Sequence, residues 1–319
     1  GHEATQDYGK KIIDFSDQKI IKQIIKKNKF QFRKYCHQDF LLNKALERND
    51  IKDVKYKGIS INTKAIRKND LFFCIKGKKT DGHKFAKEAL KKGAAKLIVS
   101  KKVKNVPTKK IIKVKDTFRT LNSLAKITRD NSAAQIIGIT GSVGKTTLKN
   151  LVAFILNNYG KVYQSPHSYN NKFGVPFSLS NLKKNIKYGV FEIGMDKKGE
   201  IENLSKIVKP EIGVITNISG AHFKNFNTLK DIAKAKAEII DNIMENGTIV
   251  LNKDDKFFNF FSAKAKKNKI KVLSFSSKKK ADIFLSNIKK INKYYRIKIF
   301  VKGKFFYFNI PYSADNFIS

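Results

Sequence analysis

The most constraining feature of this 319-residue sequence is a glycine-rich loop between two apolar segments. The loop reads GITGSVGKTT over residues 138–147, after QII at 135–137 and before an apolar run at 148–156. This order predicts a strand, a tight turn and a helix. Gly141 and Gly144 allow the backbone to turn its N–H groups toward one point at the helix start, where the helix dipole also favours an anion. The sequence therefore predicts a phosphate-binding loop.

The side chains of this loop also suit a bound nucleotide. Lys145 brings a positive charge within reach of terminal phosphates, and the Thr146 hydroxyl is placed to contact Mg²⁺. The usual motif has another glycine six positions before its lysine, whereas this chain has Ile139 there. An ordinary strand-to-helix turn is the alternative, but it does not account for glycines, lysine and paired threonines in this order. The nucleotide-binding residues predicted here are Gly141, Ser142, Gly144, Lys145, Thr146 and Thr147.

Strand-like and helix-like segments alternate after the loop. The predicted strands are 161–165, 188–193, 212–216 and 248–251, and the predicted helices are 200–208 and 229–243. Segments of this length in this order imply right-handed crossovers and a doubly wound, mostly parallel sheet, so the fold class is α/β. Functional side chains are then expected at the carboxyl ends of the strands.

The length of the chain allows more than one hydrophobic core, and we predict three parts. Residues 1–28 carry a helical run and no Met, and the first Met of the chain is Met195, so we expect further sequence upstream. Residues 29–114 predict a small α/β domain, and residues 115–319 contain the phosphate loop. His83 lies in a polar loop of the small domain; a loop residue near a substrate is the interpretation we assign to it.

Three side chains follow or flank the predicted strands of the second domain. Glu192 ends a strand beside the phosphate loop, where a carboxylate suits Mg²⁺; pairing with one of the many lysines is the alternative. His222 follows the next strand and a Ser-Gly turn, although a lone histidine is more often a satisfied polar residue. Lys236 lies on a predicted helix, and its spacing alone does not distinguish it from a solvated surface lysine.

Two asparagines are further candidates for contacts with a nucleotide. Asn171 belongs to a polar loop that reads NNKFGVP over residues 170–176. Asn252 follows the strand at 248–251, and with Asp254 or Asp255 it could contact a base or ribose. Capping of the loop by these short polar side chains is the competing interpretation.

The net charge of +41 would ordinarily indicate nucleic acid or an anionic surface. Only six of the 67 basic residues are Arg, and the lysines are spread along the chain, so we expect no nucleic-acid partner. No apolar run approaches the roughly 20 residues that span a bilayer, and no signal-peptide pattern opens the chain. We therefore expect a cytoplasmic protein. Cys36 and Cys74 have no metal-like spacing, and buried or incidental thiols are favoured.

The motifs above resemble those of the Mur ligase family over most of residues 40–319. A shortened TGSxGKTT loop is characteristic of the family. The NNxxGVP loop, the segment EIGMxxxGEI from Glu192 and the segment NISxAHxxxF around His222 resemble the type that adds D-alanyl-D-alanine, called MurF. Residues 29–114 resemble the family's first domain, which holds the uridine diphosphate end of the substrate. The family commonly has D-[S/T]-R where this chain has Asn62-Thr63-Lys64.

The resemblance implies roles for the candidate residues. It makes Thr146 and Glu192 ligands of an ATP-linked Mg²⁺, and Glu192 with His222 ligands of a second Mg²⁺. It makes Lys236 a lysine that reacts with carbon dioxide to give a carbamate able to hold the second metal. That reaction needs a neutral amine, which nearby cations and partial burial would favour. Lys145, Glu192, His222 and Lys236 are thus the predicted catalytic group, with Asn171 and Asn252 at the nucleotide.

The implied activity is an ATP-dependent amide ligase of peptidoglycan precursor synthesis. ATP would phosphorylate the terminal carboxylate of UDP-N-acetylmuramoyl-tripeptide, and the amine of D-alanyl-D-alanine would attack the acyl phosphate. We expect a monomer. The alternatives are another Mur-type ligase, such as a MurE-like enzyme or folylpolyglutamate synthase, a P-loop kinase or motor ATPase, and a basic nucleic-acid-binding protein.

The two ends of the sequence give further predictions about neighbouring domains. Residues 1–28 resemble the tail of a MurE ligase, which suggests a MurE-MurF fusion, while an arbitrary N-terminal helix is the alternative. Near the other end, Asp315 stands where the family has the histidine of a PGxHN element. The family's third domain would follow that element, so we expect residues 1–319 to bind nucleotide without turnover.

Overall fold

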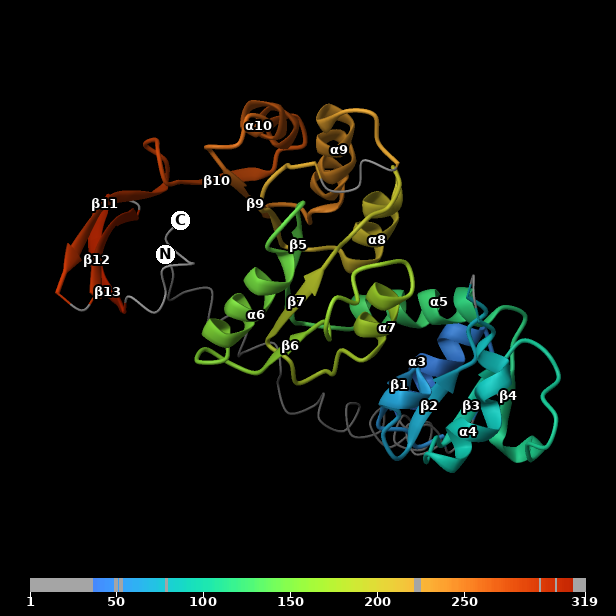
Figure 1. The fold of residues 1–319 in the computed structure, drawn as a ribbon. Coiled ribbons are helices and arrows are strands. Elements are labelled where there is room, and N and C mark those ends of the chain that lie inside the picture. Colours follow the sequence, from blue (N-terminus) through green and yellow to red (C-terminus); the bar gives the residue numbers. More distant parts are fainter. Residues whose placement is uncertain are drawn as a thin grey trace, which may run out of the picture. The chain divides into compact units, whose positions relative to one another are not determined.

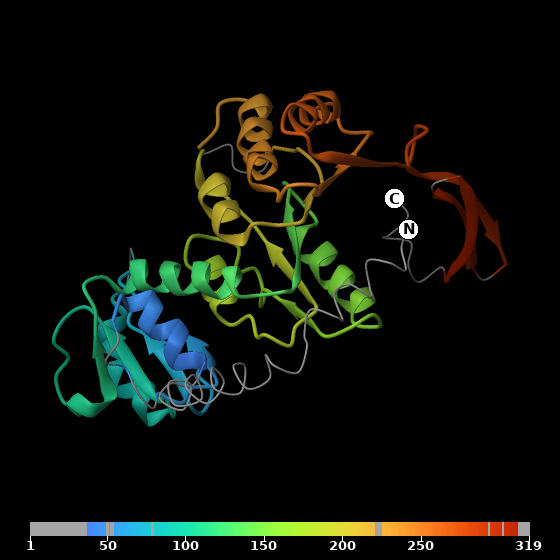
Figure 2. The ribbon, with the colours of Figure 1, turned by 180° about the vertical axis from the view of Figure 1, so that it is seen from behind.

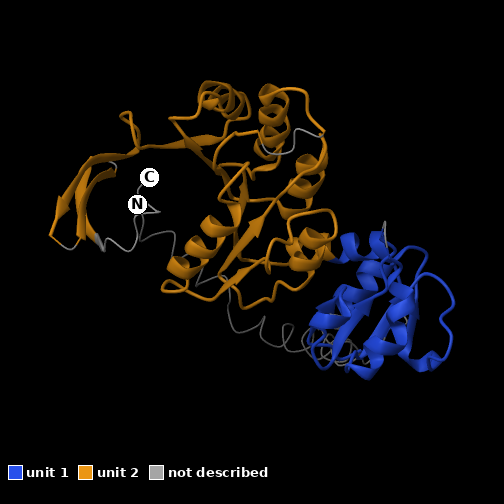
Figure 3. Ribbon diagram, viewed as in Figure 1, with its two compact units in different colours: residues 1–124 blue, residues 125–319 orange. Residues whose placement is uncertain are grey.

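The structure is a computed structural model that describes residues 37–48, 51, 54–77, 80–220, 225–292, 294–301 and 303–311. The predictions for residues 1–28, Cys36, His222 and Asp315 fall outside these ranges. The chain divides into two compact units, Gly1–Leu124 and Ala125–Ser319 (Figure 3). The division lies within helix α5 (Thr117–Asp130), whereas the sequence placed a domain boundary just before this helix, near residue 114.

The first unit is built on a four-stranded parallel sheet in the order β1-β2-β3-β4. Its strands are β1 (Gly58–Ser60), β2 (Asp70–Phe73), β3 (Lys96–Val99) and β4 (Ile111–Lys113), and its helices are α3 (His37–Leu46) and α4 (Ala86–Lys91), with 3₁₀ turns at Thr63–Ala65, Gly82–Phe85 and Thr108–Lys110. Leu71, Phe72 and Phe73 are all buried, although neighbours in a strand point to opposite faces. The sheet is therefore covered on both faces, as parallel sheets usually are.

The second unit contains a nine-stranded sheet in the order β13-β12-β11-β10-β9-β8-β5-β7-β6. Strands β5 to β11 all run parallel to one another. Strands β12 and β13 extend the sheet at one edge through antiparallel pairs. The strands are β5 (Gln135–Thr140), β6 (Val162–Gln164), β7 (Tyr188–Glu192), β8 (Ile212–Ile215), β9 (Thr248–Asn252), β10 (Lys271–Ser276), β11 (Ile283–Ile291), β12 (Tyr294–Val301) and β13 (Lys304–Pro311). The chain places β6 and β7 on one side of β5 and then crosses to β8 on the other side. The strand order thus reverses beside β5, where α/β sheets bind their ligands.

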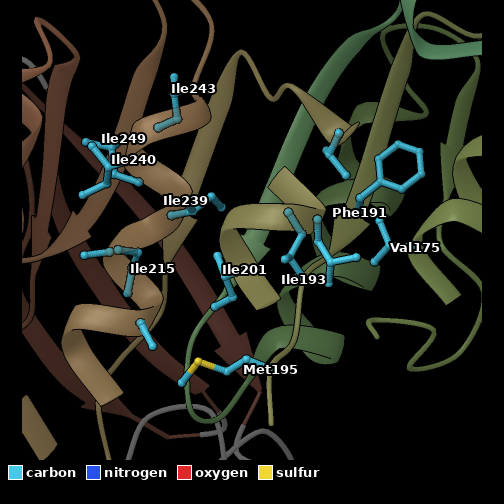
Figure 4. Packing of buried hydrophobic residues seen from close by; sticks show 14 of the residues in the cluster. Val175, Phe191, Ile193, Met195, Ile201, Ile215, Ile239, Ile240, Ile243 and Ile249 are labelled. Atoms are coloured by element: carbon cyan, nitrogen blue, oxygen red, sulfur yellow. The ribbon is translucent and has the colours of Figure 1, made fainter. Parts of the chain in front are cut away.

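Helices cover both faces of this sheet (Figures 1 and 2). Along β5, Ile136 packs into one core cluster, while Ile137 and Ile139 pack into the other, as the alternation of a strand requires. Helix α6 (Lys145–Leu156) contributes to the smaller cluster. The larger cluster, part of which Figure 4 displays, draws on α7 (Gly174–Ser180), α8 (Glu200–Val208), α9 (Leu229–Lys236), the 3₁₀ segment Ala237–Asn242 and α10 (Phe258–Lys267).

The predicted α/β class and the mostly parallel sheet of the second domain are confirmed, whereas the parallel arrangement of the first domain's strands was not predicted. Several details differ. The polar loop predicted at 170–176 gives way to α7 from Gly174, whose first turn accommodates Pro176. The helix predicted over 229–243 is an α-helix only to Lys236 and continues as a 3₁₀ segment. Among the described residues, no helix is both long enough and apolar enough to cross a membrane.

Candidate nucleotide-binding site

The loop between β5 and α6 adopts a conformation that only glycine fits at Gly141. Its φ is +146°, and a Cβ placed there would lie 1.8 Å from Thr216 Oγ1. Gly144, with φ of +82°, precedes the first residue of α6, Lys145. The two glycines therefore lead the chain from the strand end directly into the helix N-terminus, as the sequence predicted.

The segment after β8 holds this loop in place. Ser142 N–H donates to Asn217 O (2.9 Å), and Val143 N–H donates to Asn217 Oδ1 (3.1 Å). Thr216 Oγ1 donates to Val143 O (2.7 Å), and Ser219 N–H donates to Ser142 Oγ (2.9 Å). The phosphate loop is thus shaped before any ligand arrives.

Glu192 places a buried carboxylate at the end of β7, next to the loop. The residue is 1% exposed. Its Oε2 accepts a hydrogen bond from Thr146 Oγ1 (2.8 Å), and its Oε1 accepts one from Asn170 Nδ2 (2.7 Å). Thr146 and Glu192, which the sequence assigned to one Mg²⁺ site, therefore lie in direct contact. Asn170 was not singled out from the sequence, although its neighbour Asn171 was.

Two of the predicted lysines meet at one carbonyl of the loop. Lys145 Nζ donates to Gly141 O (2.8 Å) and Ser142 O (3.2 Å), and Lys236 Nζ donates to the same Gly141 O (2.9 Å). Lys236 is 1% exposed, so it is not the solvated surface lysine that spacing alone allowed. Burial, with the nearby charge of Lys145, lowers the pKa of Lys236 to about 7. Burial also lowers the pKa of Lys145, against an opposing effect of Glu192.

A third lysine, Lys149, belongs to the same group and was missed from the sequence. It is 1% exposed, its Nζ lies 3.9 Å from Glu192 Oε2, and it donates to the carbonyl of His167. Its position on α6, one turn after Thr146, was the available signal, because residues three apart share a helix face. In a chain this rich in lysine, that spacing alone does not distinguish a buried lysine from exposed ones.

The candidate asparagines make capping contacts in the structure. Asn171 Oδ1 accepts from the N–H groups of Phe173 (3.0 Å) and Gly174 (2.9 Å) at the start of α7, and Asn252 Oδ1 accepts from Asp254 N–H (2.9 Å). Asp254 and Asp255 likewise accept from backbone N–H groups of Ser277, Phe257 and Ile218. Loop capping thus accounts for these contacts, and the nucleotide contacts of Asn171 and Asn252 remain predictions.

The remaining predicted residues lie on α6 itself or in the first unit. Thr147 is an exposed residue of α6. His83 belongs to the first unit, where its Nδ1 contacts Asp81 Oδ1 (2.7 Å) and its Nε2 accepts from Ser100 N–H (3.0 Å). The ring nitrogens of His83 are therefore engaged in holding its own loop. Burial raises the pKa of Cys74 to about 12, which makes it an unreactive core thiol.

The oxygens at Glu192 suit a hard divalent cation. Thr146 Oγ1 and Glu192 Oε2 are 2.8 Å apart, and oxygen ligands of this kind are those that Mg²⁺ prefers. In the described ranges, no group of three or more His, Cys, Asp and Glu residues could hold a metal by itself. The residues fit an ion that takes one or two protein ligands and completes its shell with phosphate oxygens and water.

A glycine loop at the point where the strand order reverses, with a buried carboxylate and three lysines around it, defines a P-loop nucleotide-binding domain. Comparison with protein families agrees and is more specific. The Mur ligase middle domain matches residues 139–319, and the Mur ligase family catalytic domain matches residues 55–130. This chain belongs to the Mur ligase family.

Individual relatives carry one name. The chain is 35% identical over 260 residues to the UDP-N-acetylmuramoyl-tripeptide–D-alanyl-D-alanine ligase of Rickettsia prowazekii, covering 81% of this chain and 58% of the relative. It is 38% identical over 237 residues to the ligase of the same name from Buchnera aphidicola of Acyrthosiphon pisum, covering 74% and 52%. The chain therefore spans little more than half the length of these relatives.

Solved structures of similar fold carry the corresponding name. A crystal structure of MurF from Acinetobacter baumannii matches with a TM-score of 0.74 at 27% identity, covering 86% of this chain and 60% of that one. MurF from Thermotoga maritima, in complex with ADP, matches with a TM-score of 0.69 at 30% identity, covering 81% and 59%. The described architecture is thus that of the corresponding part of MurF structures.

Proposed function

We propose that this chain is the nucleotide-binding part of an ATP-dependent ligase that adds D-alanyl-D-alanine to UDP-N-acetylmuramoyl-tripeptide. The observation that carries the proposal is the direct contact of Thr146 with the buried Glu192 beside a preshaped phosphate loop. The names of the relatives, and the ADP in one related structure, supply the nucleotide and the substrates.

The phosphate loop binds the nucleotide in this proposal. The backbone around Gly141, Ser142 and Gly144 and the N-terminus of α6 face the phosphates, with the Thr146 and Thr147 amides at the helix start. Lys145 leaves its loop carbonyls and neutralises the transferred phosphoryl group. Thr146 and Glu192 hold a Mg²⁺ that, when bound, screens the negative charge of the phosphates. Asn171 and Asn252 are assigned to the nucleotide from the sequence alone.

Lys236 has a second proposed role, as a carbamate. Its neutral amine attacks carbon dioxide, a C–N bond forms and a proton leaves, so that a cation becomes an anion. The pKa of about 7 supports this step, since much of the amine is neutral near physiological pH. The carbamate, with Glu192 and His222, would hold a second Mg²⁺.

The proposed reaction joins two half-reactions. A carboxylate oxygen of the tripeptide attacks the γ-phosphorus of ATP, and ADP leaves. The amine of the dipeptide then attacks the acyl carbon, phosphate leaves, and a peptide bond forms with loss of a proton. The preformed loop and its lysines hold the phosphates during both steps, so the site fixes geometry and charge before substrates arrive.

We also propose roles for the other parts of the chain, a cellular location and an oligomeric state. Residues 29–114 hold the uridine diphosphate end of the substrate, and residues 1–28 belong to a preceding MurE-like domain. We infer a cytoplasmic monomer without a nucleic-acid partner. The lysine-rich surface then serves solubility and attraction of anionic substrates rather than a specific partner.

The choice of acceptor tests this proposal. The polypeptide that carries this chain is incubated with ATP, Mg²⁺ and UDP-N-acetylmuramoyl-tripeptide, together with D-alanyl-D-alanine or a single amino acid, and the products are identified by mass. We expect only the dipeptide to be joined to the tripeptide. Joining of the single amino acid to the tripeptide, with no product from the dipeptide, would instead indicate another Mur-type ligase.

A further inference from the structure

Lys149 is a buried cation at the candidate site to which neither the sequence nor the proposed reaction assigns a role. It follows Thr146 by three positions on α6, so both side chains lie on the same face of the helix. Its ammonium donates to the carbonyl of His167 and lies 3.9 Å from Glu192 Oε2. Both Lys149 and Glu192 have side chains that are 1% exposed. A buried ammonium needs such partners, because an unpaired charge in the interior is costly.

The carbonyl that Lys149 binds belongs to the loop 165–170 between β6 and α7. His167 has a φ of +44°, in the left-handed region that non-glycine residues adopt only with backbone strain. The side chains of His167 and Ser168 are exposed, so burial of their side chains does little to hold this turn. The hydrogen bond from Lys149 therefore stabilises a strained backbone at the centre of the loop.

The same loop supplies two groups to the site. Asn170 Nδ2 donates to Glu192 Oε1 (2.7 Å), and Ser168 Oγ lies 3.3 Å from Thr146 Oγ1. Asn170 O also accepts from Gly194 N–H (2.8 Å), just beyond the end of β7. The position of the loop thus determines how the Glu192 carboxylate is oriented.

We propose that Lys149 is a positioning residue, which fastens the loop 165–170 and orients the Glu192 carboxylate toward Thr146 before a nucleotide binds. Lys145 and Lys236 do not duplicate this role, because both bond to the carbonyl of Gly141 on the phosphate loop. The inference rests on the proposed function only in assigning Glu192 to a nucleotide-linked Mg²⁺.

Two measurements on the 319-residue chain test this role. The variants are Lys149→Met, which removes the charge and the donors, Lys149→Arg, which keeps both, and Lys184→Met as a matched control at an exposed lysine. Hydrogen exchange without ligand reports the order of residues 165–170. Calorimetric titration with ADP, in EDTA and in Mg²⁺, separates the metal-dependent part of the affinity from the rest.

For Lys149→Met we expect exchange at residues 165–170 to quicken about tenfold or more, with strands β5, β7 and β8 unchanged. The gain in ADP affinity on adding Mg²⁺ should fall about tenfold, while affinity in EDTA stays within about threefold of the wild type. Lys149→Arg should recover much of both effects, and Lys184→Met should match the wild type.

Other results would overturn the role. Unchanged exchange at 165–170 would show that Lys149 does not fasten the loop. An increased gain from Mg²⁺ in Lys149→Met would mean that the lysine only repels the metal. Equal losses in EDTA and in Mg²⁺, with faster exchange throughout the unit, would reduce Lys149 to a general packing residue. A wild-type chain that binds no ADP would refute the proposed function. The hydrogen-exchange measurement would still test whether Lys149 holds the loop 165–170 in place.

Discussion

The conformation of Gly141 determines what the phosphate loop can do. Its φ of +146° and the closeness of Thr216 leave no room for a side chain, and the same turn presents its carbonyl to both Lys145 and Lys236. One residue therefore sets the path of the loop and gathers two cations beside it.

We predict that Gly141→Ala weakens ADP binding by about tenfold or more, because the new Cβ would force the loop away from Thr216. Gly303→Ala is the matched control, since Gly303 also has a positive φ (+89°) but open space around it. Isothermal titration of both variants with ADP and Mg²⁺ makes the comparison. Equal affinities for Gly141→Ala and the wild type would contradict the described loop.

The lowered pKa of Lys236 gives a second prediction at this level. Its neutral fraction should be about one half near pH 7 and about nine-tenths near pH 8, whereas an ordinary lysine would stay almost fully protonated. In ¹³C-bicarbonate, a carbamate carbon signal should therefore rise between pH 6 and pH 8, after allowing for the falling share of dissolved carbon dioxide. Lys236→Met should lack this signal. A wild-type chain without it at any pH would exclude the carbamate.

The same depressed pKa makes a statement about stability. The unfolded chain holds a proton on Lys236 up to about pH 10.5, and the folded chain releases it near pH 7. Folding is therefore disfavoured by this group below pH 7, and the penalty disappears as the pH rises from about 7 to 10.5. Lys236→Met should flatten this part of the pH dependence of thermal unfolding.

Part of the site could be predicted from the sequence, and the rest could not, for physical reasons. Thr146 and Glu192 could be predicted to meet, because a loop motif and a strand end fix both near one sheet edge. Lys149 and Asn170 depend on tertiary packing, since each contacts Glu192 from a different segment. The burial of Lys236 could not be predicted from its spacing along the helix either.

Among the elements, those with regular periodicity were predicted best. Helix α8 (Glu200–Val208) has the bounds expected from its apolar spacing, and β5 follows directly from the phosphate-loop motif. Helix α7 was hidden in a sequence with glycine and proline near its start, where it depends on the cap from Asn171. No element was predicted for the antiparallel pairs of β11 to β13.

The start of α8 depends on a carboxylate from the 3₁₀ segment that follows α9. Glu238 is 8% exposed, and its two oxygens accept from the N–H groups of Gly199 (2.8 Å) and Glu202 (3.0 Å). Helix N-termini leave such N–H groups without partners inside the helix, so this carboxylate caps α8 from a distance.

We predict that Glu238→Ala destabilises the second unit by about 1–3 kcal/mol, because it leaves two donors unsatisfied. Glu202→Ala is the control, as its side chain is 45% exposed and, among the described residues, forms a surface pair with Lys206, a contact worth roughly 0.3–0.5 kcal/mol. The midpoint temperature of thermal unfolding, followed by circular dichroism, should fall by several degrees for Glu238→Ala. It should change little for Glu202→Ala. Similar shifts for both would refute the cap.

At the level of the whole molecule, the two units differ in the residues that they contribute to the candidate site. The described site residues, from the phosphate loop to Lys236, all belong to the second unit, and the first unit has its own parallel sheet and core. The charge of +41 did not indicate the family, because it is spread over the chain, whereas the phosphate loop at residues 138–147 and the motifs after it did. Local motifs were therefore more informative here than composition.

We propose that this site uses ATP to join a dipeptide to a nucleotide-linked peptide. The most direct test is phosphate release by the polypeptide that carries this chain, given ATP, Mg²⁺ and UDP-N-acetylmuramoyl-tripeptide, with and without D-alanyl-D-alanine. We predict release that requires the dipeptide, equals the peptide bonds formed, and is abolished by Lys145→Ala. Release that is indifferent to the dipeptide, or near-normal turnover by Lys145→Ala, would contradict the account.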